Sequence, residues 1–258
     1  MRKFTAAMLV ILLFTLSSCG NEIDVVGETK TYEIPSGIHS LEIQIGAADF
    51  TIEHGNKFFV ESNLINLSVS EKNGVLSVME DEPGISGIHS TDYTDAKLKL
   101  CIPAGIVFES VDITTGAARL TADSLSANSV ALKLGAGNVQ FGCLNAYSKA
   151  DITGGAGEIT IASGTLTDLD LSVGVGELNL NAALLGNNEL EFGVGKSKLT
   201  LIGSKDDYRL DLAEGIGSIT VDGMEASDFD TSGYGQNYVK IHGGVGTVDI
   251  AFQVEPFI

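Results

Sequence analysis

Polar and apolar residues alternate along most of the chain, and the motif Gly-x-Gly interrupts the alternation at regular intervals. Apolar side chains mostly occupy the positions one, three and five residues before the first glycine, and the position six residues after it. A period of two is typical of β-strands with one buried face, whereas a helix repeats its apolar positions every three to four residues. Each repeat is therefore predicted to be strand, bend and strand.

Eight copies of the motif align in the same phase. From the second copy onward, the steps between copies are 19, 20, 19, 19, 22 and 29 residues. Hairpins of a flat meander need not repeat their side chains in phase, but stacked turns must, because like positions lie over one another about 4.8 Å apart. We therefore predict an all-β fold, a β-solenoid of 19–22-residue turns with the apolar ladders inside. The copies begin at Gly46, Gly116, Gly135, Gly155, Gly174, Gly193, Gly215 and Gly244.

The position between the two glycines always holds Ala, Val or Ile, and Ala48 and Ala118 replace the second glycine in two copies. A bend residue with positive φ strongly favours glycine, and alanine tolerates that conformation poorly. We therefore expect the second position to require small size, where stacked bends approach closely, more than a positive φ.

Three segments are predicted along the chain. Residues 1–18 resemble a lipoprotein signal peptide, residues 19–36 are polar and acidic and are predicted to form a flexible tether, and residues 37–258 form the β-solenoid domain. The repeat is blurred at about 57–105, where Asn73-Gly74 between two apolar runs predicts a hairpin. We expect this region to widen or cap the solenoid.

The amino terminus indicates the compartment. Arg2 and Lys3 precede an apolar run too short to span a bilayer, and Leu16-Ser17-Ser18-Cys19 follows it. This resembles a bacterial lipobox, in which Cys19 is lipidated and becomes the mature terminus; an ordinary secretory signal is the alternative. We predict a secreted lipoprotein of the cell envelope, anchored to a membrane by Cys19 on the extracytoplasmic side.

Charge and motif content exclude several functions. Met1–Ser18 carry two basic and no acidic residues, so cleavage changes the formal net charge from −19 to −21, which disfavours nucleic acid as a partner. Arg119 and Arg209 are the only arginines left, and no nucleophile elbow or aromatic sugar platform is found. The position after the second glycine varies too much for repeated calcium ligation. We predict no catalytic residue, no metal site and no cofactor.

Cys101 and Cys143 remain in the mature chain after Cys19. Alternation predicts that Cys143 points inward with the residues two and four positions before it, and that Cys101 points outward. Two turns between them correspond to about 9–10 Å of stacking, which is too far for a disulfide. We therefore predict that they do not pair.

One column of outward positions, four residues before each first glycine, is mostly acidic. Like charges on neighbouring strands repel, so raised carboxyl pKa values are expected along it. The column is either a solvated acidic surface or a face that binds divalent cations or a basic partner. As a possible binding face it comprises Glu42, Asp112, Asp151, Asp170, Glu189 and Asp211, and the other two copies have Ala131 and Lys240.

The runs LKLCIPAG at 98–105 and VDITTG at 111–116, with the later Gly-x-Gly strand pairs, resemble the putative-adhesin family of bacterial β-strand-repeat domains of unknown function. The resemblance covers roughly residues 37–252. It implies a right-handed, β-helix-like fold on secreted or membrane-attached proteins and brings no catalytic residues. We predict an adhesin-like binding or structural module whose partner is an unidentified surface protein or polysaccharide; the alternatives are a carbohydrate-active β-helix enzyme and an envelope-stress regulatory or sensory lipoprotein.

Overall fold

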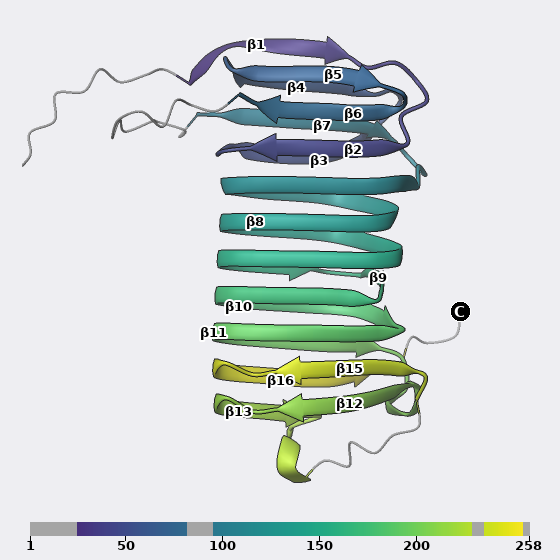
Figure 1. Cartoon of the computed structure of the whole chain (residues 1–258), viewed down its shortest axis with the longest axis vertical. Helices are drawn as coiled ribbons and strands as arrows, with labels where there is room; N and C mark the ends of the chain where they lie inside the picture. Colours follow the sequence, from purple (N-terminus) through teal and green to yellow (C-terminus); the bar gives the residue numbers. More distant parts are fainter. Residues whose placement is uncertain (1–24, 82–94, 229–234, 255–258) are drawn as a thin grey trace, which may run out of the picture.

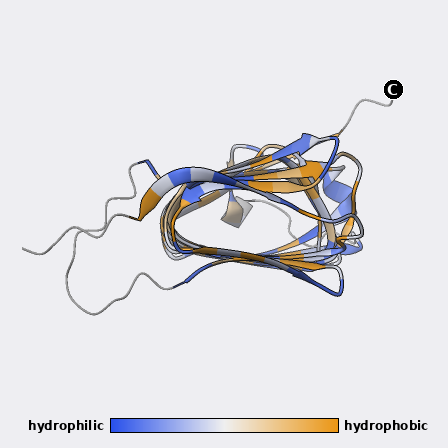
Figure 2. Ribbon diagram, turned by 90° about the horizontal axis from the view of Figure 1, so that it is seen from above, coloured by the Kyte–Doolittle hydropathy of each residue, from blue (hydrophilic) through white to orange (hydrophobic). Residues whose placement is uncertain are grey.

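The fold consists of stacked β-strands. The computed structural model describes residues 25–81, 95–228 and 235–254, and within them one 16-stranded sheet and no α-helix. The strands pile up along the long axis of the molecule (Figure 1) and form two facing layers when seen from above (Figure 2). The all-β prediction is confirmed. The elements are β1 (Val26–Glu33), β2 (Ser40–Ile45), β3 (Asp49–Gly55), β4 (Phe59–Leu64), β5 (Leu67–Lys72), β6 (Val75–Glu80), β7 (Lys97–Pro103), β8 (Phe108–Ile161), β9 (Gly164–Thr167), β10 (Leu169–Leu185), β11 (Asn187–Ile202), β12 (Tyr208–Ala213), β13 (Ile216–Val221), β14 (Met224–Glu225), β15 (Asn237–His242) and β16 (Val245–Gln253), with 3₁₀ turns η1 (Lys205–Asp207) and η2 (Ala226–Asp228).

Successive turns pair in parallel and in the register that the alignment predicts. Gly176 of β10 pairs with Gly157 of β8 on one side and with Gly195 of β11 on the other. β8 is long because its backbone stays extended through the bends. It therefore winds through several turns of the stack in Figure 1. Like positions therefore lie over like positions, which is the condition for side-chain columns.

Stacking order departs from chain order near both ends of the sheet. The pair β2–β3 lies between β6–β7 on one side and β8 on the other. The last pair, β15–β16, lies between β11 and the pair β12–β13, although it follows both in the sequence. The long step of 29 residues before Gly244 provides the connection that this insertion needs.

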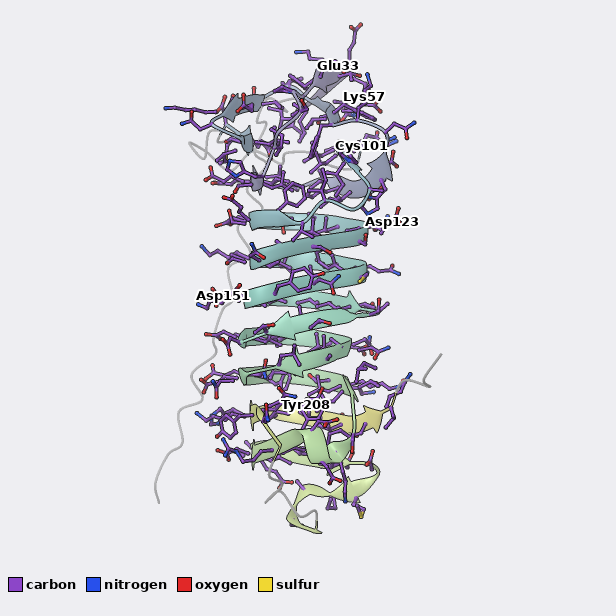
Figure 3. All side chains as sticks on the ribbon, turned by 90° about the vertical axis from the view of Figure 1, so that its right-hand side faces the viewer. Glu33, Lys57, Cys101, Asp123, Asp151 and Tyr208 are labelled. Carbon is purple, nitrogen blue, oxygen red and sulfur yellow. The ribbon has the colours of Figure 1, made fainter. Side chains whose placement is uncertain are left out.

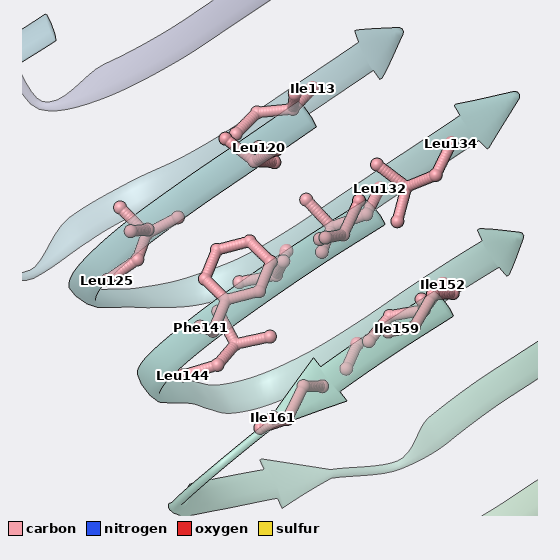
Figure 4. Close-up of a cluster of buried hydrophobic side chains, with 14 of the residues drawn as sticks. Ile113, Leu120, Leu125, Leu132, Leu134, Phe141, Leu144, Ile152, Ile159 and Ile161 are labelled. Atoms are coloured by element: carbon pink, nitrogen blue, oxygen red, sulfur yellow. The ribbon is translucent and has the colours of Figure 1, made fainter. Parts of the chain in front are cut away.

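The core runs between the two layers as columns of aliphatic and aromatic side chains. Leu132 and Phe141, on either side of one bend of β8, and Ile152 of the next turn point into the same interior (Figure 4). All three are at most 1% exposed. Leu171, at the position of Leu132 and Ile152 in a later turn, and Ile219, four residues after Gly215, are equally buried. Removing this apolar surface from water is the main driving force for stacking.

The amino-terminal region corrects one predicted boundary. Residues 26–33, assigned to a flexible tether, form β1, which pairs antiparallel with β4. A polar, acidic strand is possible there because most of β1 is exposed and its backbone bonds to β4 hold it. The predicted signal peptide, Cys19 and the predicted tether up to residue 24 lie outside the described residues. Among the described ranges, no helix has the length and apolar character needed to cross a membrane.

The irregular segment at about 57–105 caps the stack. β4 pairs antiparallel with β1 and β7, and β5 with β6. The predicted hairpin is confirmed: Asn73 and Gly74, both with positive φ, join β5 to β6. This pair of left-handed residues suits the twist of a two-residue hairpin.

The Gly-x-Gly bends line up along the left-hand edge in Figure 1. The second glycine has a φ between 130° and 159° in all six copies that keep it, and an added Cβ would overlap a backbone carbonyl of the neighbouring turn. Our expectation that size matters more than φ is therefore wrong for these copies, since both constraints act. Ala48 and Ala118 do not have positive φ, so their bends differ in backbone conformation.

The residue between the glycines points outward. Val175, Val194, Val245 and Ile216 are 54%, 50%, 47% and 76% exposed. They pair in that order in adjacent turns and form a narrow apolar ridge. The bend interrupts the alternation, so an apolar residue at this position is not part of the interior ladder.

Candidate functional site

The predicted acidic column exists, but it is not continuous. Asp170 lies between Asp151 and Glu189, and at the other end Glu42 pairs with Asp112. Figure 3 shows Asp151 projecting from one face of the stack and Asp123 from the opposite face. The structure thus brings five members together as neighbours across strands, in one group of three and one group of two.

Lys240 interrupts the column at its carboxyl-terminal end. Because β15 is inserted, Lys240 pairs in register with both Glu189 and Asp211. The expectation that Glu189 and Asp211 follow each other is therefore wrong. The sequence contained one signal of this insertion, since Lys240 belongs to the same aligned column and follows the longest step between copies.

Cations within this face change its electrostatics. Lys240 Nζ donates to Glu189 Oε1 at 2.7 Å, and this hydrogen bond lowers the pKa of Glu189 below its ordinary value. Lys149 Nζ lies 3.0 Å from Asp151 Oδ2, and the pKa of Lys149 is raised by that hydrogen bond and by the charges of Asp151 and Asp170. The predicted rise of carboxyl pKa values is wrong at Glu189, where attraction to lysine replaces repulsion.

Asp211 takes part in a local cluster on the same face. It accepts a hydrogen bond of 2.6 Å from the hydroxyl of Tyr238, and this bond raises the pKa of Tyr238. The guanidinium of Arg209 stacks over the Tyr238 ring at 4.7 Å from its centroid. One of the two arginines in the described residues is therefore engaged within the fold.

The opposite face carries a polar hollow of about 160 Å³ on β8. Side chains from three successive passes line it, in the two outward columns that follow the bends. Sequence alignment placed Arg119, Asn138 and Glu158 in one column without showing that they border a hollow. The polar hollow is lined by Arg119, Leu120, Thr121, Asn138, Val139, Gln140, Glu158 and Thr160.

Both remaining cysteines are free, and the predicted inward orientation of Cys143 is wrong. Cys101 alternates with the core residues Leu100 and Ile102 and is not part of the core cluster, but it is covered by its surroundings. Cys101 is 3% exposed, and burial raises its pKa. Cys143 is half-buried because a shift of phase gives the inward position to Leu144. β3 lies between β7 and β8, so three strand spacings separate the two levels, about 14 Å and not the two turns assumed from the sequence.

Within the three described ranges, no group of three or more His, Cys, Asp or Glu side chains is arranged to hold a metal ion. The acidic column presents single carboxylates on successive strands, and two of its members are paired with lysine. The described residues therefore present two polar faces, the acidic column on one side of the stack and the polar hollow on the other.

Comparison with known proteins relates the chain by fold. No family model and no curated protein matches the sequence. A solved structure of a putative adhesin from Bacteroides fragilis is 14% identical, with a TM-score of 0.54, over 88% of this chain and 99% of that one. A putative adhesin from Parabacteroides distasonis is 12% identical, with a TM-score of 0.46, over 90% and 100%. The chain therefore has the fold of structures named putative adhesins, which agrees with the resemblance found in its sequence.

Proposed function

We propose that this protein is a non-catalytic surface-binding module of the cell envelope, built as a right-handed β-solenoid. The observation that carries the proposal is the in-register stacking of parallel turns, which repeats outward polar side chains in columns along two faces. Such a surface suits an extended partner, since each turn offers the same kind of contact. The name given to the Bacteroides fragilis structure supports the same role.

The proposal includes two faces on which a partner can lie. The acidic column would receive a basic protein surface, and the polar hollow would receive a ligand rich in hydroxyl groups. A net charge of −19 for the full sequence disfavours polyanions on most of the surface.

Binding is tested with a lipid-free protein that begins at residue 20. It should bind saturably to a panel of immobilised surface polysaccharides and extracellular proteins and should release the bound partner unchanged. Glu42→Gln with Asp112→Gln, distant from the hollow, tests the acidic face separately. Absence of saturable binding to the whole panel, or release of a cleaved partner, would contradict the proposal.

The anchor is tested in cells. We propose that Cys19 is lipidated, which would hold the module near a membrane outside the cytoplasm. Cys19→Ala should move the protein from the membrane fraction to the soluble fraction or leave its signal peptide uncleaved. Detergent-dependent partitioning of a correctly cleaved Cys19→Ala protein would argue against lipid anchoring.

A further inference from the structure

The polar hollow is a row of different hydrogen-bonding groups at strand spacing. Arg119 and Thr121 come from one pass of β8, Asn138 and Gln140 from the next, and the third pass adds a carboxylate and a hydroxyl. Neighbouring strands are about 4.8 Å apart. A ligand that lies along the stack therefore meets a new pair of polar side chains at each strand.

Arg119 has an unused guanidinium. It is exposed, and Asp49 lies directly opposite on the neighbouring strand, yet no ion pair joins them in the part of the chain that the structure describes. A guanidinium offers parallel N–H groups that match a carboxylate in a bidentate manner. Arg209, by contrast, stacks on Tyr238. The hollow thus presents an available anion-binding group at one end.

At the other end of the polar hollow, hydrogen bonds within the protein hold the Glu158 carboxylate in place. The Glu158 carboxylate accepts hydrogen bonds from the Thr160 hydroxyl at 3.3 Å and from Asn179 Nδ2 at 3.4 Å. These contacts hold its charge on the far side of the hollow from Arg119. Between them, Asn138 and Gln140 provide amides that both donate and accept, as sugar hydroxyl groups require.

We propose that this hollow binds a glycan that carries a carboxylate, with the acidic sugar on Arg119 and the hydroxyl groups of the following sugars on Asn138 and Gln140. The inference rests on the proposed binding function and names its ligand class. A long polyanion fits less well, because Glu158 and the acidic surface repel it. The site selects a glycan whose acidic sugar lies at one end of the bound segment.

The test uses trisaccharides with one terminal uronate, which is galacturonate, glucuronate or mannuronate, and two neutral sugars. Each is compared with the same trisaccharide after its carboxyl group is reduced to an alcohol. Titration calorimetry of the lipid-free protein should show binding of at least one uronate trisaccharide and at least tenfold weaker binding of its reduced form. Arg119→Gln should weaken uronate binding at least tenfold and leave binding of the reduced form nearly unchanged. Asn138→Ala should weaken both.

Arg209→Gln is the matched control, since it removes the other arginine from the opposite face and should leave uronate binding unchanged. Thermal melts must show that each variant is folded. Equal binding of acidic and reduced forms, equal effects of the two arginine substitutions, or no binding of any uronate overturns the inference. If no uronate trisaccharide binds while saturable binding to the panel of surface partners persists, the inference fails and the proposed function stands.

Discussion

Lys240 Nζ lies 2.7 Å from Glu189 Oε1, although 51 residues separate them in the sequence. The contact exists because β15 is inserted against β11, which places a lysine in a column that is otherwise mostly acidic. It also sets the electrostatic character of this end of the face, since Asp211 lies on the other side of Lys240.

Replacing Lys240 by Gln should raise the pKa of Glu189 toward its ordinary value, because the hydrogen bond that lowers it is lost. The native contribution of Glu189 to stability is present above its unfolded pKa and disappears as the pH falls through its lower folded pKa. NMR titration of the Glu189 carboxyl in both proteins measures the shift, and Lys198→Gln on the other face is the control. An unchanged Glu189 pKa would show that Lys240 is not its main partner.

Calcium should stabilise the protein no more than sodium chloride of matched ionic strength, because lysines already pair with Asp151 and Glu189. Thermal melting in millimolar calcium measures this. The double variant Lys149→Gln with Lys240→Gln leaves Asp151 and Glu189 without their lysine partners. Its melting temperature should therefore depend more strongly on the concentration of either salt. A specific calcium gain that disappears with Asp151→Asn and Asp170→Asn would instead establish this face as a cation site.

Gly176→Ala should destabilise the fold strongly. Gly176 has a φ of 141°, and a Cβ there would overlap the carbonyl of Gly157. Gly105 also has positive φ but has open space around it, so Gly105→Ala should cost roughly 1–2 kcal/mol of unfolding free energy from conformation alone. We expect Gly176→Ala to cost about 2 kcal/mol more than this in urea unfolding. Equal losses of unfolding free energy in the two variants would mean that neighbouring turns can move apart to make room for the added Cβ at no cost in free energy.

The two thiols should differ in reactivity. At pH 8, a thiol reagent should modify half-buried Cys143 quickly and Cys101 slowly, because burial shields Cys101 and raises its pKa. Lipid-free protein denatured without reductant should then show both thiols. Cys143→Ser should remove the fast phase and Cys101→Ser the slow one. Finding no thiol in the denatured protein would demonstrate a disulfide.

The sequence predicts the repeating unit well and the order of the units poorly. Alternation around Gly174 and Gly193 identifies strands, buried positions such as Leu171 and the register between turns, because each follows from local period and stacking. It does not reveal that Lys240 lies between Glu189 and Asp211, since the parallel pairing of equivalent turns allows more than one stacking order.

The prediction of side-chain orientation fails where the backbone departs from the regular alternation of inward and outward residues. Leu144 takes the inward position that alternation assigns to Cys143, and Val194 is exposed within its bend. Hydropathy is the same for an apolar residue on either side of the sheet, so only the local backbone decides its direction. The polar hollow could not be predicted for a related reason. The sequence alignment shows which residues share the columns of Arg119 and Thr121, but it does not show how deep the space between their side chains is.

The inserted last turn has a consequence for how this molecule is made. Repeat proteins can often be shortened from an end, because each unit rests only on the one before it. Here β12 pairs only with β15 among the described strands, and β15 and β16 follow all the other described strands in the sequence. A nascent chain that has reached Val221 therefore lacks the strands that lie between β11 and β12–β13, and β15 and β16, which are synthesised later, complete an interior turn and not an end.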